Sequence, residues 1–163
     1  EQEEQAMVVQ DIENRLAAAG LKVNKNNTYQ VNAAQVSHLK TDISVAQIGH
    51  KTLVELIKTL HPSPAICGLP RDQAQDFIQQ NEALDRKFYA GYLGLVHAHL
   101  AQASIGFEGL HSIEADLYVN LRCMEYQSGT AIVYVGSGIT SGSQPEKEWE
   151  ETILKAQTIK KVI

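Results

Sequence analysis

The sequence predicts a mixed α/β fold, in the α+β sense, with an antiparallel sheet flanked by helices. In the first half of the chain, apolar residues recur at the spacing of amphipathic helices. The second half changes to short runs rich in Tyr, Val and Ile, which are typical of strands. A last stretch returns to helical character after Pro145. Helices, then a meander of strands, then a closing helix predict this fold class.

Three helices are expected before the change of period. Their apolar positions are Met7, Val8, Ile12 and Leu16, then Leu53, Leu56, Ile57 and Leu60, and finally Ala74, Phe77 and Ile78 within residues 71–80. Gly20 is expected to cap the first helix, and the second is expected to stop at His61 because Pro62 follows. Residues 23–31 are polar and rich in Asn, so we expect a loop that leads into a short strand.

Strands are expected over residues 89–95, 115–124 and 131–135. Gln127-Ser128-Gly129 predicts a hairpin turn between the last two. The closing helix is expected from Pro145, because proline suits the first turn of a helix. Residues 98–114 are too irregular to assign.

Composition bounds the kinds of function. The 163 residues fit one domain with a core, and 44% hydrophobic with 20% charged residues is typical of a soluble globular protein. The net charge of −5 gives no support to nucleic-acid binding, and no apolar run approaches the roughly 20 residues that span a bilayer. The acidic start and two cysteines outside any disulfide framework suit a reducing, cytoplasmic location.

Residues 61–70, His-Pro-Ser-Pro-Ala-Ile-Cys-Gly-Leu-Pro, make a poor helix and a poor central strand. Proline fixes φ, removes a hydrogen-bond donor and restricts the residue before it. We expect a rigid, extended wall with a preset shape for a small ligand. Cys67 lies in its apolar run and is expected to be a small buried hydrophobe.

The closing helix carries Glu148, Glu151 and Lys155 on one face. Spacing alone leaves two interpretations open. One is a solvated face with a single Glu-Lys pair four residues apart. The other is a carboxylate that holds a hard cation beside a lysine that holds an anion, because Mg²⁺ uses one or two protein carboxylates with water and substrate oxygens.

Several motifs together resemble the isochorismate synthases, within the family of chorismate-utilising enzymes. Residues 61–65 resemble His-Pro-Thr-Pro-Ala, and 149–155 resemble the closing motif of the family. Further matches are Leu121-Arg122-Cys123 with an Ile-Arg strand motif, 136–139 with a Gly-Ala-Gly-Ile loop, 88–91 with an aromatic-Tyr-small-Gly segment, and 4–9 with a Glu-His-x-Met-Val-Val helix. Gln5 stands in place of the histidine and Ser137 in place of the alanine. The matches run from Glu4 to Lys155 in the family's order.

The resemblance implies roles for particular residues. It places magnesium at Glu4 and Glu151, with Glu148 assisting. It places chorismate at Arg122, Lys155, Gly136, Gly138 and Tyr89, against a wall that includes His61, Ala65 and Ile66. The chemistry suits Arg122, because a guanidinium binds a planar carboxylate through two hydrogen bonds. Taken alone, residues 136–138 also fit a plain turn, and Tyr89 also fits a half-buried strand tyrosine.

The resemblance implies a magnesium-dependent conversion of chorismate to isochorismate, with water added at C2 of the ring while the C4 hydroxyl leaves. In the family, the lysine base and the glutamate acid precede the metal-binding helix, and no residue here matches either. We therefore expect residues 1–163 to be the C-terminal portion of a chorismate-binding catalytic domain, inactive alone. Its exposed inner face is expected to favour self-association.

Two alternatives stay open. Ammonia-using anthranilate and aminodeoxychorismate synthases carry Pro-x-Gly-Thr or Pro-Gly-Gly-Ser where this chain has Pro-Ser-Pro-Ala, so the water-using reaction is favoured over theirs. A non-catalytic chorismate-binding module is the other alternative. Among the pathways, menaquinone biosynthesis is favoured over siderophore or salicylate formation.

Overall fold

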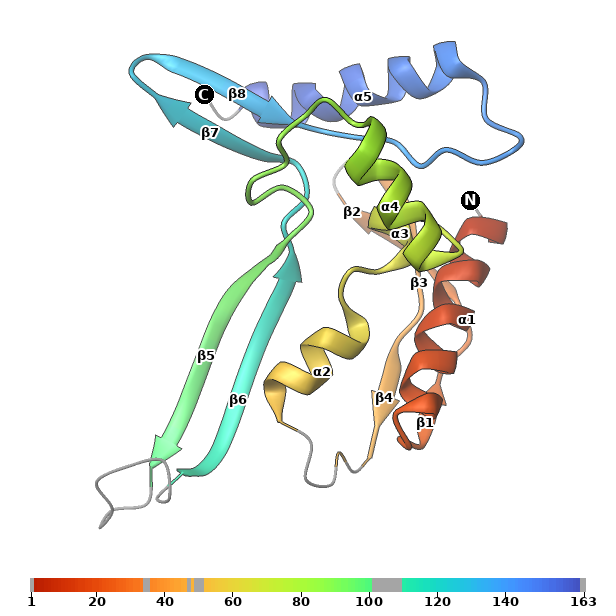
Figure 1. Cartoon of the computed structure of the whole chain (residues 1–163), viewed down its shortest axis with the longest axis vertical. Helices are drawn as coiled ribbons and strands as arrows, with labels where there is room; N and C mark the ends of the chain where they lie inside the picture. The colour runs from red at the N-terminus through yellow and green to blue at the C-terminus, as the bar shows by residue number, and fades with distance from the viewer. Residues whose placement is uncertain (1, 34–35, 47, 49–51, 101–109, 162–163) are drawn as a thin grey trace. The chain divides into compact units, whose positions relative to one another are not determined.

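Groups of helices and groups of antiparallel strands follow one another along the chain, which confirms the predicted fold class (Figure 1). The computed structural model describes residues 2–33, 36–46, 48, 52–100 and 110–161. The chain divides into two units, residues 1–81 and 82–163.

The first unit opens with helix α1, Gln2–Ala18. Gly20 ends it at φ +77°, with its N–H bonded to the Ala17 carbonyl and the Leu21 N–H bonded to the Leu16 carbonyl. These two bonds satisfy the last carbonyls of the helix, as a glycine after its end allows, so the predicted cap is confirmed. The predicted inner face is wrong in part: Val9 is buried, whereas Met7 is 45% exposed.

Residues 23–33 and 36–45 form two nested antiparallel ladders, so the expectation of a loop over 23–31 is wrong in part. The strands are β1 Val23–Lys25, β2 Tyr29–Ala33, β3 Val36–Lys40 and β4 Ile43–Val45, with β1 paired to β4 and β2 to β3. Asn26 and Asp42 join the ladders. The Asn26 side chain donates to the Asp42 carboxylate at 2.9 Å and accepts from the Asp42 N–H at 2.8 Å. The side-chain hydrogen bonds of Asn26 help to hold these strands together, and the apolar pattern of the sequence does not reveal them.

Helices α2 Leu53–Leu60 and α4 Arg71–Asn81 lie near their predicted positions. Thr52 and Glu55 form a capping box at the start of α2, which ends at His61 as expected. Phe77 on α4 is 66% exposed, so its predicted inward direction is wrong.

The segment 61–70 is not extended throughout, which corrects the predicted wall. Residues Pro64–Cys67 form one helical turn, α3. Pro64 stands at its first position, where a missing N–H costs nothing. Cys67 is 5% exposed, which confirms the buried hydrophobe, and burial raises the pKa of its thiol.

The second unit begins with a long hairpin of β5 Tyr92–Leu100 and β6 Leu110–Val119 (Figure 1). Gly94 lies opposite Leu117 in its ladder. A Cβ built at Gly94 would stand 1.8 Å from the carbonyl oxygen of Asp116, closer than any real Cβ approaches. Only glycine therefore fits where the two backbones come together.

Two predicted strand boundaries are wrong. Tyr89 lies in a turn over residues 87–90, before β5 begins. The predicted strand 115–124 breaks at Arg122, which has φ +54°, and β7 Cys123–Gln127 begins after it. The following turn is confirmed: β7 pairs with β8 Thr130–Tyr134, and Ser128 and Gly129 adopt φ +52° and +82°. Positive φ at both central residues is characteristic of a type I′ hairpin turn.

Helix α5, Pro145–Lys160, closes the chain as predicted and packs against β8 (Figure 1). Proline stands at its first turn, with Glu146 and Glu148 near its positive end. The residues that precede it, 135–144, connect β8 to α5. The candidate functional site lies where this connection meets one face of α5.

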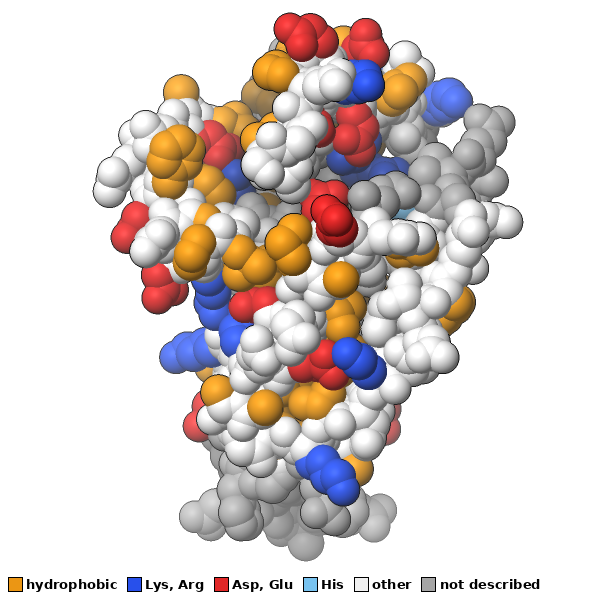
Figure 2. Space-filling view, turned by 90° about the vertical axis from the view of Figure 1, so that its right-hand side faces the viewer, with side chains coloured by type: hydrophobic (Ala, Val, Ile, Leu, Met, Phe, Trp, Pro, Cys, Tyr) orange, Lys and Arg blue, Asp and Glu red, His pale blue; other side chains and the backbone are white. Residues whose placement is uncertain are grey.

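Many hydrophobic side chains among the described residues are exposed to solvent. Side chains of hydrophobic residues lie among polar and charged ones on the face shown in Figure 2. On the β5–β6 hairpin, Tyr92, Val96 and Ala98 share one face with their cross-strand partners, since residues two apart and partners across a ladder point the same way. Val96 is 53% exposed and Ile113 is 45% exposed. Self-association through such surface stays a prediction.

The helices among the described residues are too short or too polar to cross a membrane.

Gly94→Ala is expected to lower the free energy of unfolding by about 1–3 kcal/mol, the cost of forcing extra volume into a packed position. Urea unfolding followed by circular dichroism measures it. Gly142→Ala is the matched control in the same unit, because a Cβ there meets nothing within 4 Å. A Gly94→Ala chain as stable as the control would contradict the close approach.

Candidate functional site

Helix α5 presents Glu148, Glu151 and Lys155 toward the connection that follows β8. Positions three and four apart lie on one face of a helix, so the three side chains point the same way. Lys155 Nζ is 2.8 Å from Glu151 Oε1 and donates to the Gly136 carbonyl oxygen at 3.0 Å. The lysine therefore ties its own helix to the glycine-containing connection.

Ser137 adds a second tie between the same two segments. Its hydroxyl contacts Glu151 Oε2 at 2.8 Å and makes a shorter hydrogen bond to Glu148 Oε2. Two carboxylates thus converge on one oxygen. The Glu-Lys pair of the first interpretation is present, with the Glu151 side chain 50% exposed, and the Ser137 contacts add to it, so both interpretations of this helix face stay open.

Tyr89 reaches the same connection from the turn before β5. Its ring stacks on that of Tyr134, with centroids 5.9 Å apart, and a Cβ built at Gly136 would lie 2.7 Å from the Tyr89 hydroxyl. Asn120 holds the turn by donating to the Phe88 carbonyl at 2.9 Å. Burial raises the pKa of the Tyr89 hydroxyl, which therefore keeps its proton at neutral pH.

The charge of Arg122 acts weakly on one residue of α5, Glu151. The pKa of Glu151 is lowered chiefly by the hydrogen bond from Lys155, then by that from Ser137, with a smaller contribution from the Arg122 charge. Glu151 therefore carries its negative charge at neutral pH. Arg122 holds φ +54°, an uncommon backbone state for a residue with a side chain, and such states gather at functional sites.

The second unit thus brings together most of its predicted site residues. They are Tyr89, Gly136, Glu148, Glu151 and Lys155 by direct geometry, and Arg122 by its charge. Gly138 follows two positions after Gly136 and is exposed. This convergence is what a site for an anionic ligand beside a cation requires.

The proline-rich segment in the first unit is held by two arginines. Arg15 of α1 donates to three carbonyl oxygens around the end of α2, those of Thr59, Leu60 and Pro62, at 2.9, 3.3 and 3.2 Å. Asp11 pairs with Arg15 at 2.5 Å, and Arg71 donates to the His61 carbonyl oxygen at 2.9 Å. Hydrogen bonds from charged groups are the stronger kind, so this backbone is firmly placed.

The predicted wall residues lie on this segment. His61 is half-buried, and the pKa of its imidazole is lowered by burial first and then by the charges of Arg71 and Arg15. It is therefore neutral at neutral pH. Ala65 is exposed and Ile66 is half-buried, both on α3. Their contact with a ligand stays a prediction.

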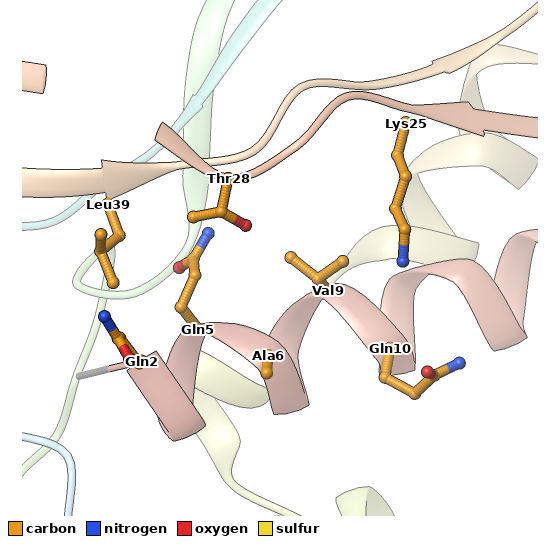
Figure 3. A pocket seen from close by; sticks show the side chains of 8 residues that line it. All are labelled: Gln2, Gln5, Ala6, Val9, Gln10, Lys25, Thr28 and Leu39. Atoms are coloured by element: carbon orange, nitrogen blue, oxygen red, sulfur yellow. The ribbon is translucent and has the colours of Figure 1, made fainter. Parts of the chain in front are cut away.

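Glu4 lies exposed on α1, and its joint role with Glu151 stays a prediction. A cavity of about 410 Å³ lies between α1 and the strands of the first unit (Figure 3). Its lining is Gln2, Gln5, Ala6, Val9, Gln10, Lys25, Thr28 and Leu39. The described lining offers amide, hydroxyl and ammonium groups without a carboxylate, which does not suit a divalent cation.

Two sets of side-chain contacts were not predicted from the sequence. The contacts of the Ser137 hydroxyl with two carboxylates of α5 were not predicted, although its difference from the family's alanine was a signal that the position differs. The hydrogen bonds from Arg15 to the end of α2 join residues more than 40 positions apart in the sequence, and no local sequence pattern indicates such a contact.

The whole chain, residues 1–163, matches the family described as chorismate binding enzyme. Isochorismate synthase MenF of Escherichia coli is 30% identical over 162 residues, which are 99% of this chain and 34% of that protein. The solved structure of the menaquinone-specific isochorismate synthase from Escherichia coli matches with a TM-score of 0.81 and 30% identity, covering 98% of this chain and 34% of that chain.

Anthranilate synthase component 1 of Aquifex aeolicus is 31% identical over 132 residues, which are 80% of this chain and 24% of that protein. The chain therefore spans about a third or less of the length of these relatives. The predicted resemblance is confirmed at the level of the family.

Gly136→Ala is expected to destabilise the second unit, because the new Cβ would lie 2.7 Å from the Tyr89 hydroxyl oxygen. Tyr89→Phe removes that oxygen, and the next ring atom is 3.8 Å away, an ordinary contact. The double variant should therefore be more stable than the sum of the single effects allows. Thermal unfolding of the four chains measures the cycle, and additive effects would show that the two residues are not in contact.

Proposed function

This chain belongs to the chorismate-binding enzyme family, and from that membership we propose that it supplies the substrate- and cation-holding part of an isochorismate synthase. The observation that carries the proposal is the convergence of Tyr89, Glu151 and Lys155 on the connection after β8. Isochorismate synthases are prominent among its relatives, and one of them matches nearly the whole chain. The reaction proposed is the reversible conversion of chorismate to isochorismate, as part of menaquinone biosynthesis in the cytoplasm.

The cationic side chains would hold the carboxylates of chorismate. The Arg122 guanidinium can bind one carboxylate through two parallel hydrogen bonds. Lys155 carries three donor hydrogens, and its contacts with Glu151 and Gly136 use two of them, so a third is left for a substrate oxygen. Backbone N–H groups at Gly136 and Gly138 and the protonated Tyr89 hydroxyl would add neutral donors.

Magnesium fits the donor set of α5. Glu148 and Glu151 offer hard carboxylate oxygens that already converge on one point, and Mg²⁺ typically takes one or two such ligands with water and substrate oxygens. When bound there, the ion would screen the negative charge of the substrate and polarise its oxygens. Glu4 is proposed as a further ligand on the resemblance alone.

We propose that residues 1–163 form the C-terminal portion of a larger catalytic domain and do not turn chorismate over alone. The chain spans 34% of the Escherichia coli synthase. The family's lysine base and glutamate acid find no counterpart in this sequence. His61 is neutral and half-buried, which suits a residue of the pocket wall.

An ammonia-using synthase is the second candidate, because an anthranilate synthase component is also a relative. The Pro-Ser-Pro-Ala segment favours water as the nucleophile. The Arg15 and Arg71 hydrogen bonds give this segment a fixed backbone, which a choice between two small nucleophiles would need.

The reaction is tested with a chimera in which this chain replaces the matching 34% of the Escherichia coli synthase. With chorismate and Mg²⁺, we expect isochorismate whether or not ammonium is present, and no product from the isolated chain. Lys155→Met in the chimera should lower kcat/KM about tenfold to a hundredfold, the value of a hydrogen bond to a charged group. Liquid chromatography with mass spectrometry identifies the products.

Lys147→Met, on an exposed position of the same helix, is the matched control and should leave kcat/KM unchanged. An aminated product that requires ammonium would select the second candidate. A folded chimera that binds chorismate without converting it would favour a non-catalytic module. Turnover by the isolated chain would contradict its proposed inactivity.

A further inference from the structure

Ser137 contacts two carboxylates at once where the connection after β8 meets α5. Its Oγ is 2.8 Å from Glu151 Oε2 and closer still to Glu148 Oε2. A serine hydroxyl carries one hydrogen, so it can donate to one carboxylate at a time. The second carboxylate then faces an oxygen that does not donate to it.

The two carboxylates differ in their other partners. Glu151 already accepts from the Lys155 ammonium at 2.8 Å through Oε1. Among the described residues, Ser137 is the hydrogen-bond donor to the Glu148 carboxylate. Lys155 therefore holds Glu151 whichever carboxylate takes the hydroxyl hydrogen, whereas Ser137 is the group that holds Glu148. Two carboxylates drawn to one oxygen repel each other, and a divalent cation between them would offset that repulsion.

We propose that Ser137 is a positioning residue whose hydroxyl holds the Glu148 carboxylate beside the Lys155-bound Glu151 carboxylate, so that the two form a paired ligand for a divalent cation. The inference rests on the proposed function, in which the same carboxylates hold magnesium. Ser137 acts through the carboxylates and needs no contact with the ion. Alanine at this position would leave the backbone unchanged and release the Glu148 carboxylate, while Lys155 would still hold Glu151.

Mn²⁺ binding to the purified chain tests the proposal, with the free ion measured by electron paramagnetic resonance. Ser137→Ala should weaken Mn²⁺ affinity about tenfold or more, as is typical when a group that orients metal ligands is removed. Ser137→Thr keeps the hydroxyl and should retain most of the affinity. Ser141→Ala, at an exposed position in the same connection, is the matched control.

A second measurement separates this inference from the proposed function. Unfolding of Ser137→Ala, Glu148→Gln and the double variant without metal forms a double-mutant cycle, and non-additive effects are expected if the hydroxyl holds Glu148. A wild-type chain that binds no Mn²⁺ but shows this coupling would contradict the cation site and support the positioning contact. Additive effects, or a Ser137→Ala chain that binds Mn²⁺ as tightly as wild type, would overturn the inference.

Discussion

The contact between α5 and the connection after β8 is the interaction on which the site depends. Lys155 reaches from the helix to the Gly136 carbonyl, and Ser137 reaches back to the helix carboxylates. These opposing hydrogen bonds fix the distance between a helix face and a backbone segment. A ligand that must meet both carboxylates and backbone N–H groups needs that distance to be set before it arrives.

Other features of the second unit follow from this contact. Glycine is required at position 136 because the Tyr89 hydroxyl occupies the space that a side chain would fill. The turn that carries Tyr89 is bonded in turn to Asn120, just before the positive φ of Arg122. Tyr89, Gly136 and Arg122 come from three separate segments, and the same backbone arrangement sets the positions of all three. In the first unit, Arg15 and Arg71 fix the proline-rich segment in a comparable way.

Local chemistry explains which parts could be predicted from the sequence. Helix ends at Gly20 and His61, the turn at Ser128-Gly129 and the start of α5 at Pro145 each follow from a residue that acts on its immediate neighbours. The strand β1 was missed in the expected loop over residues 23–31, because side-chain hydrogen bonds of Asn26 and Asp42, without an apolar alternation, join the ladders there. The break at Arg122 was missed because arginine does not signal a positive φ.

The same distinction between local sequence signals and contacts with distant residues applies to the candidate site. Spacing on α5 predicted that Glu148, Glu151 and Lys155 share a face, and the family resemblance indicated what they meet. The difference of Ser137 from the family's alanine marked the position, but its side-chain contacts could not be predicted because they depend on a helix that follows several residues later in the chain. The joint action of Glu4 with Glu151 rests on the resemblance.

Calorimetric titration of the purified chain with chorismate, with and without Mg²⁺, tests the central claim most directly. If this chain holds both substrate and cation, chorismate should bind, bind more tightly with Mg²⁺, and be recovered unchanged. The absence of chorismate binding by the folded chain in saturating Mg²⁺ would contradict the account.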